Sequence, residues 1–84
     1  MDKPAYFYVY ILQSKIHTER YYTGFAVNLE KRHKDHNSGK EPHTSKYKPW
    51  RIKTAIAFTD RQKALDFEKY LKTKSGRAFA RKRL

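Results

Sequence analysis

The sequence contains no cysteine, few turn-forming residues and no long hydrophobic run. Its 84 residues include only three glycines and three prolines. Without cysteine the chain has neither disulfides nor thiolate metal sites, and nothing demands an oxidising compartment. No apolar run approaches the roughly 20 residues needed to cross a bilayer, and the first four residues lack the apolar core of a secretion signal. We therefore expect a cytoplasmic protein that does not associate with membranes.

Acidic residues are also scarce. Eight Asp and Glu stand against 20 Lys and Arg, which gives a formal net charge of +12. A field of this sign attracts polyanions and speeds encounter with them, although basic residues can also serve solubility alone. Nucleic acid is thus the expected partner, DNA first and RNA second. The positive net charge predicts that the protein binds nucleic acid, but it does not indicate whether the protein catalyses a reaction.

The length favours one domain that spans residues 1–84, because 84 residues leave no room for a second independent core. Seven Tyr, five Phe and one Trp supply much of the apolar area for that core. Neither an internal repeat nor a linker interrupts the chain. All function must therefore share one unit.

Three segments have the composition of strands. Residues 6–12 are β-branched or aromatic with no polar face, which predicts a central strand covered on both sides. Residues 21–27 fit the second arm of a hairpin, in which Gly24 indicates a bulge or the close approach of another backbone. Residues 52–58 alternate and predict a third strand with one well-buried face.

A first helix of about ten residues is expected between Asn28, which can cap it, and Ser38-Gly39, which ends it. Leu29 is its only large apolar residue. Three polar side chains share the inward face with Leu29 at helical spacing: Arg32, His33 and His36. This unusual inner face marks them as candidate functional residues.

A second helix should begin at Thr59, which has capping-box spacing to Gln62, and run to about Lys72. Its apolar stripe consists of Ala64, Phe67 and Leu71. Glu68 falls inside that stripe, where a carboxylate is costly unless it is paired or binds a cation. Glu68 is therefore the most informative acid in the chain.

The remaining segments are basic. Residues 40–50 have no clear period and predict a loop closed by Trp50, which we place in the core. Residues 69–84 hold seven basic residues and no acid, with Ser75-Gly76 as a break before a short last helix. The expected fold is an α/β (α+β) sandwich, in which helices flank a three-stranded antiparallel sheet in the order β-β-α-β-α plus a short C-terminal helix.

These residue types suit phosphodiester hydrolysis, which needs a cation, a base and positioning. A carboxylate such as Glu68 can hold Mg²⁺, and the planar guanidinium of Arg32 can clamp a phosphate. A tyrosine hydroxyl near a guanidinium or metal ion can relay a proton. Tyr8, Tyr10 and Tyr22 also have a structural interpretation, as core residues with a satisfied hydroxyl.

The motifs and their order resemble those of the GIY-YIG nucleases. The two-part signature is represented by Tyr8-Val9-Tyr10 and, after eleven intervening residues, Tyr22-Thr23-Gly24. Asn28 to Arg32, His36 to Gly39 and Phe67-Glu68-Lys69 follow in the family's order. The chain is most similar to short, stand-alone bacterial members, which resemble the nuclease domain of the excision-repair incision subunit, and it is also similar to homing endonucleases.

The resemblance implies a role for five residues. Tyr10 and Tyr22 match the signature tyrosines, Arg32 the phosphate-binding arginine, His36 the accessory acid-base position, and Glu68 the ligand of Mg²⁺ or Mn²⁺. Many members carry an asparagine after the metal-binding glutamate, and none follows Glu68 here.

Cations mixed with aromatic side chains are typical of a surface that follows a phosphate backbone. The candidate nucleic-acid-binding residues are Lys40, His43, Lys46, Tyr47 and Lys48 in the loop, and Lys74 and Arg77 in the tail. An 84-residue domain offers little further surface, so strong sequence specificity would require a protein partner.

Three hypotheses follow. The leading one is a divalent-metal-dependent endonuclease that cuts DNA with structural or weak sequence selectivity, in repair or recombination. The second is a weakly active or inactive nucleic-acid-binding module, which the missing asparagine favours. The third is a basic protein associated with ribosomes, which leaves Glu68 unexplained.

Overall fold

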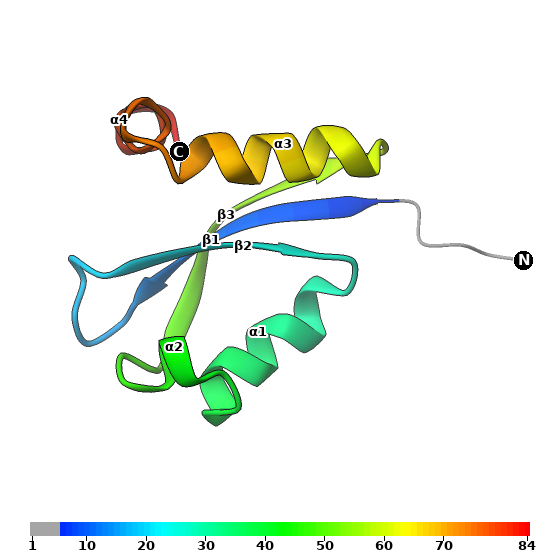
Figure 1. Cartoon of the computed structure of the whole chain (residues 1–84). Coiled ribbons are helices and arrows are strands. Elements are labelled where there is room, and N and C mark those ends of the chain that lie inside the picture. The colour runs from blue at the N-terminus through cyan, green and yellow to red at the C-terminus, as the bar shows by residue number, and fades with distance from the viewer. Residues whose placement is uncertain (1–5) are drawn as a thin grey trace, which may run out of the picture.

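One antiparallel sheet with the strand order β2-β1-β3 forms the centre of the molecule (Figure 1). The computed structural model describes residues 6–84, so the first four residues considered above lie outside the described part. The strands are β1 (Phe7–Ser14), β2 (Tyr21–Ala26) and β3 (Trp50–Phe58). The segment without a polar face is thus the central strand, as its sequence predicts.

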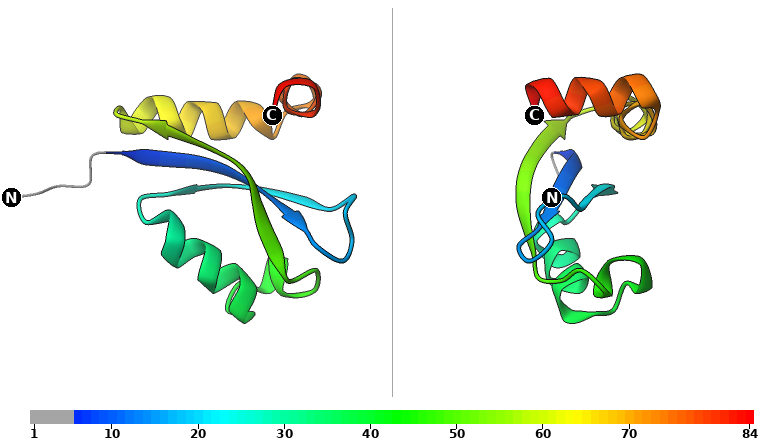
Figure 2. Two further views of the ribbon diagram at one scale, coloured as in Figure 1. Left: turned by 180° about the vertical axis from the view of Figure 1, so that it is seen from behind. Right: turned by 90° about the vertical axis from the view of Figure 1, so that its left-hand side faces the viewer.

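Helices cover both faces of this sheet. Figures 1 and 2 show α3 (Arg61–Leu71) and α4 (Lys74–Arg83) on one side, with α1 (Leu29–Ser38) and α2 (Pro42–Ser45) on the other. Alternate residues of β1 pack into two separate hydrophobic clusters, one on each face of the sheet, because successive side chains of a strand point to opposite faces. Val9 and Ile11 pack with the α3 side, while Tyr10 and Leu12 pack with the α1 side. The expected α+β architecture is confirmed, and within the described residues no helix is long and apolar enough to cross a membrane.

The third strand departs from the expected single buried face. The register of β3 on β1 shifts by one residue between Ile11 and Leu12, which leaves Lys53 unpaired as a bulge. Ile52 therefore packs with the α1-side cluster, whereas Phe58 packs with the α3-side cluster. Simple alternation cannot predict this crossing, because the extra residue reverses the phase of the strand.

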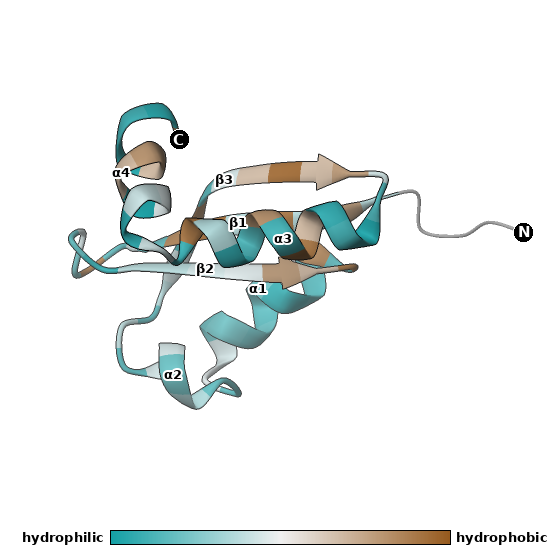
Figure 3. Ribbon diagram, turned by 45° about the horizontal axis from the view of Figure 1, so that its top comes forward, coloured by the Kyte–Doolittle hydropathy of each residue, from teal (hydrophilic) through white to brown (hydrophobic). Residues whose placement is uncertain are grey.

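The first helix has the expected ends. Asn28 accepts a hydrogen bond from the Lys31 amide at 3.0 Å, and Gly39 ends α1 in the left-handed conformation with φ of 86°. Figure 3 draws α1 almost wholly in teal, the colour of hydrophilic residues. This helix consequently depends on polar contacts to hold it against the sheet.

Three details of the expected helices are wrong. Asp60, rather than Thr59, caps α3, since its carboxylate accepts from the Lys63 amide at 3.0 Å. The loop after α1 contains the single turn of α2, which begins at Pro42. Ser75-Gly76 is no break either: the chain turns at Lys72 and Thr73 caps α4, so Gly76 lies in its first turn.

Gly76 allows α4 to approach the end of α3. A Cβ atom at this position would overlap the backbone carbonyl of Tyr70, which cannot move aside as a side chain can. We expect Gly76→Ala to lower the free energy of unfolding by about 1–3 kcal/mol or more, measured by chemical denaturation. The exposed neighbour provides the control: Ser75→Ala should leave stability nearly unchanged, and an equal effect of both substitutions would contradict the packing argument.

Candidate active site

A buried chain of hydrogen bonds connects the central strand to α1 and α2. The Tyr10 hydroxyl lies 3.0 Å from Nε2 of His36, and Nδ1 of His36 lies 2.8 Å from the Thr44 hydroxyl. All three side chains are almost completely inaccessible to solvent. Both ring nitrogens of the histidine therefore have a protein partner.

Thr44, the last residue of this hydrogen-bonded series, indicates which ring nitrogen of His36 carries the proton. The Thr44 hydroxyl is 3.4 Å from the carbonyl oxygen of Glu41, to which it can only donate. It is then free to accept from Nδ1–H of His36, which leaves Nε2 without a proton. Nε2 accepts from the Tyr10 hydroxyl in this neutral tautomer.

Gly24 makes room for the Tyr10 phenol. The two residues are paired across β1 and β2, and a Cβ atom on Gly24 would overlap the end of the Tyr10 ring. The pairing of β1 with β2 runs without a register shift, so Gly24 marks a close approach and no bulge. The approaching group is a side chain rather than the backbone that the sequence led us to expect.

The second signature tyrosine lies against the same histidine. The Tyr22 ring is 4.8 Å from the His36 ring and 6.3 Å from the Tyr10 ring between centroids. Tyr22 is partly exposed, unlike Tyr10. The histidine is thus enclosed by one buried and one accessible phenol.

Arg32 is held at the edge of this cluster by acids. Its guanidinium forms an ion pair with Glu41 at 3.3 Å and approaches Asp35 at 4.0 Å. It is also close enough to the Tyr10 hydroxyl to counteract the rise in the pKa of that phenol. Arg32 remains partly exposed, so an anion from solution can reach it.

Glu68 approaches from α3. Its carboxylate forms an ion pair with Lys72 one turn later, at 3.0 Å between Oε2 and Nζ. This pairing meets the requirement that its place in the apolar stripe imposes. The negative charge of Glu68 makes a small contribution to the raised pKa of Tyr10, after those of desolvation and of Tyr22.

Comparison with known families identifies the domain. A model of the GIY-YIG catalytic domain matches residues 6–83. The chain belongs to the GIY-YIG family. A search of curated proteins finds no significant match. Family membership implies nuclease activity on a nucleic-acid substrate, as the motifs predict.

GIY-YIG nucleases typically use a divalent metal ion, and the residues of this chain are compatible with one. Glu68 supplies a hard oxygen donor, and Mg²⁺ accepts one or two carboxylates while it retains several waters. The Glu68 side chain is 20% exposed and its partner Lys72 is 51% exposed, so this ion pair is weak and easily exchanged. Among the described residues no group of three or more acids and histidines forms a fuller metal site.

His33 and Asn37, two inward-facing polar residues of α1, have a structural role. Nε2 of His33 is 2.7 Å from the carbonyl oxygen of Trp50, and the Asn37 amide contacts both the amide and the carbonyl of the same residue. These contacts attach α1 to the beginning of β3. His33 thus lies apart from the Tyr10 cluster, although it shares the predicted face with Arg32.

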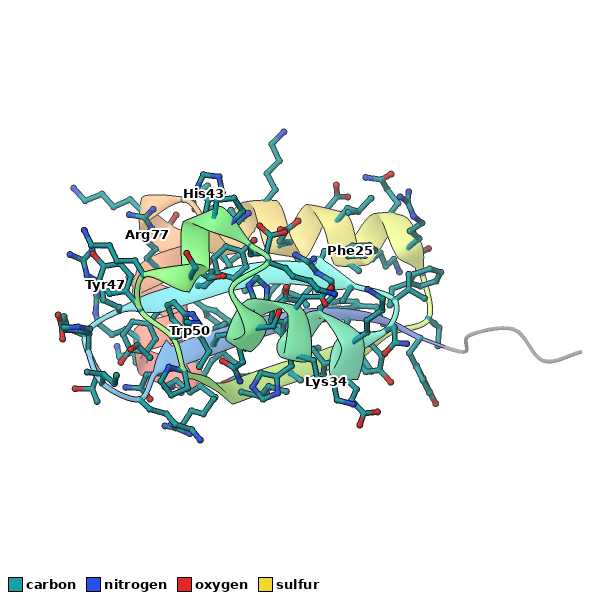
Figure 4. All side chains as sticks on the ribbon, turned by 90° about the horizontal axis from the view of Figure 1, so that it is seen from below. Phe25, Lys34, His43, Tyr47, Trp50 and Arg77 are labelled. Carbon is teal, nitrogen blue, oxygen red and sulfur yellow. The ribbon has the colours of Figure 1, made fainter. Side chains whose placement is uncertain are left out.

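The candidate nucleic-acid-binding residues fall into two groups. Lys40, His43, Lys46, Lys48, Lys74 and Arg77 are exposed. The Tyr47 ring, in contrast, packs against the α1-side core and is covered by Arg20 at 4.6 Å and His17 at 5.4 Å. Figure 4 shows His43, Tyr47 and Arg77 towards one end of the molecule. Trp50 is buried and donates to the Thr44 carbonyl at 2.8 Å, which confirms its place in the core.

Sequence reasoning missed Glu41 and Thr44. Both come from the segment around α2, where a single helical turn leaves no periodic signal. Pro42 at the first position of this turn was the only available indication, since proline favours the start of a helix.

Burial controls the protonation of two groups in the cluster. Desolvation raises the pKa of Tyr10 to about 12, with smaller contributions from Tyr22 and Glu68. Desolvation, assisted by the charge of Arg32, lowers the pKa of His36 below its usual range. At neutral pH Tyr10 is therefore a proton donor and His36 a proton acceptor.

The lowered pKa of His36 predicts a pH-dependent stability. The unfolded chain protonates this histidine near pH ~6.5 while the native state resists protonation, so its contribution is complete above that pH and is lost as the pH falls towards the native pKa. The free energy of unfolding, measured from about pH 7.5 to about pH 5, should fall more steeply for the native protein than for His36→Gln. Parallel profiles for the two proteins would show that His36 titrates normally.

Proposed function

We propose that this domain is a divalent-metal-dependent endonuclease that hydrolyses phosphodiester bonds in DNA. The support is the arrangement around His36, where the two signature tyrosines lie beside the Arg32 guanidinium, together with the carboxylate of Glu68, whose charge raises the pKa of Tyr10. Hydrolysis needs a group that removes the proton of water, a cation on the phosphate and fixed positions for both. Each requirement has a candidate among these side chains.

In the proposed reaction Tyr10 and His36 form the proton relay. A water molecule attacks phosphorus in line with the leaving oxygen and loses its proton to the Tyr10 hydroxyl, which passes its own proton to Nε2 of His36. The hydroxyl is buried in the free protein and becomes accessible when Arg32 moves from it to the phosphate. The transfers occur together, because a phenol with a pKa of about 12 does not ionise near neutral pH. Thr44 positions the relay by holding Nδ1 of His36.

The remaining residues bind and orient the phosphate. Arg32 exchanges its contact with Glu41 for a phosphoryl oxygen, for which its planar guanidinium is suited. Tyr22, which is partly exposed, orients the phosphate or the attacking water from the side of β2. Glu68 would hold a Mg²⁺ or Mn²⁺ ion, whose charge stabilises the phosphoryl and leaving oxygens.

We assign the chain to the short, stand-alone members similar to the excision-repair incision subunit, and expect a structure-selective or weakly sequence-selective enzyme of repair or recombination in the cytoplasm. The exposed cations of residues 40–48 and of the tail support contacts with phosphates, which carry no sequence information. Strong sequence selectivity would have to come from a protein partner.

A binding module is the second candidate. Glu68 is bound by Lys72, and no asparagine follows it in the sequence to complete the site found in many relatives. A chain of this charge would still bind DNA or RNA with steep salt dependence. The presence or absence of metal-stimulated turnover distinguishes the two candidates.

The role of Glu68 can be tested by plasmid nicking in the presence of Mg²⁺. Glu68→Gln keeps the shape of the side chain and removes its charge, so cleavage should fall at least about a hundredfold. Asp66→Asn is the matched control, because Asp66 is an exposed acid on the same helix, and Gln62 is its only side-chain hydrogen-bond partner among the described residues. Equal cleavage by the native protein and Glu68→Gln would refute the assigned role.

The proton relay predicts that removal of the Tyr10 hydroxyl group strongly reduces turnover. Tyr10→Phe keeps the ring but removes the hydroxyl between water and His36, so turnover should fall by roughly a hundredfold or more. Tyr70→Phe makes the same change on an exposed tyrosine of α3 outside the candidate site and should leave turnover nearly unchanged. Initial nicking rates are compared at saturating Mg²⁺, after denaturation curves have confirmed that each variant is folded. If Tyr10→Phe remains active while Tyr22→Phe is inactive, the relay is wrong.

A further inference from the structure

Figure 2 shows α4 running across the end of α3. A basic groove lies between these helices and β2. Its volume is about 580 Å³. Five cationic side chains line it: Arg20, Lys53, Lys72, Arg77 and Arg81. Glu19 is the one acid among its lining residues. A groove with this charge attracts a polyanionic chain.

Two residues of the groove contact members of the candidate site. Tyr22 lines the groove and also packs against His36, with 4.8 Å between ring centroids. Lys72 lines the groove and also forms the ion pair with Glu68 at 3.0 Å. A polynucleotide bound in this groove therefore passes beside Tyr22 and Lys72, which contact His36 and Glu68 of the candidate site.

Aromatic and apolar surface accompanies these cations. The Tyr21 side chain lines the groove and is 53% exposed, although it is a large aromatic residue. Apolar side chains from three elements also contribute: Ile11, Leu71 and Ala80. An exposed phenol can stack on the face of a base, but only where that base is unpaired, because the bases of a duplex already stack on one another.

We propose that this groove binds a single-stranded segment of the nucleic-acid substrate, next to the bond that is cut. Arg77 and Arg81 contact successive phosphates from one face of α4, since residues four apart in a helix are neighbours. Tyr21 stacks on a base, which makes binding independent of sequence but selective for unpaired strands. The inference deepens the proposed nuclease function and rests on it for the identity of the substrate.

Binding of labelled oligonucleotides without metal ions tests the groove. Fluorescence anisotropy is measured over a range of salt for a single strand of about 16 nucleotides and for the matching duplex. Arg77→Ala/Arg81→Ala should reduce the slope of log affinity against log salt by about 1.4 for the single strand, at about 0.7 per phosphate contact. The matched control is Lys82→Ala/Arg83→Ala, which removes two exposed charges of the same helix that do not line the groove.

The stacking residue has its own readout. Tyr21→Thr keeps a strand-forming residue but removes the ring, so affinity for the single strand should fall about fivefold or more and affinity for the duplex should stay nearly constant. Equal slopes for the two double variants would overturn the groove, and equal losses on both ligands for Tyr21→Thr would overturn the selectivity for single strands. Cleavage does not enter the measurement, so a chain without nuclease activity could confirm the groove and an active nuclease could refute it.

Discussion

The hydrogen bond between the Tyr10 hydroxyl and His36 is the contact on which both the α1 layer and the candidate site depend. Leu29 is the only large apolar residue of α1, so burial of hydrocarbon contributes little to holding this helix on the sheet. A buried imidazole without partners costs about 1–3 kcal/mol for each unsatisfied nitrogen. Tyr10 and Thr44 satisfy both nitrogens, and the helix is thereby fixed at the position that brings Arg32 beside the phenol. Stability and chemistry share one network here.

Much of this arrangement follows from periodicity in the sequence. Helical spacing from Leu29 correctly placed Arg32 and His36 on the inner face, and the apolar stripe of α3 correctly required a partner for Glu68. The partner, Lys72, stands at the i,i+4 spacing that favours a Glu–Lys pair on a helix, although the sequence analysis did not name it. Glu41 and Thr44 were missed for a different reason: their contacts depend on the path of a loop, and one helical turn has no period to detect. The bulge at Lys53 could not be predicted from the sequence either, because the apolar and polar residues on both sides of it alternate normally.

The absence of a side chain at Gly24 links the two faces of the sheet. Tyr10 belongs to the α1-side cluster, whereas Glu68 belongs to a helix on the α3 side. A side chain on Gly24 would displace the Tyr10 ring, which lies across β2 at this position. With glycine there, the phenol comes close enough to be affected by charges on both sides, from Arg32 and from Glu68. Gly24, the last residue of the Tyr22-Thr23-Gly24 motif, thus has a steric explanation in this chain.

Each charged residue of the proposed mechanism has an internal counter-charge in the absence of substrate. Glu41 pairs with Arg32, and Lys72 pairs with Glu68. Binding of substrate therefore exchanges ion pairs rather than exposing bare charges, which keeps the desolvation cost low. The second exchange also connects the candidate metal ligand with the groove. If Glu68 held a metal ion, the Lys72 ammonium, which already lines the groove, would be released, and a strand in the groove would stabilise it. Metal ion and single strand should consequently favour each other's binding, because both compete with the same weak ion pair.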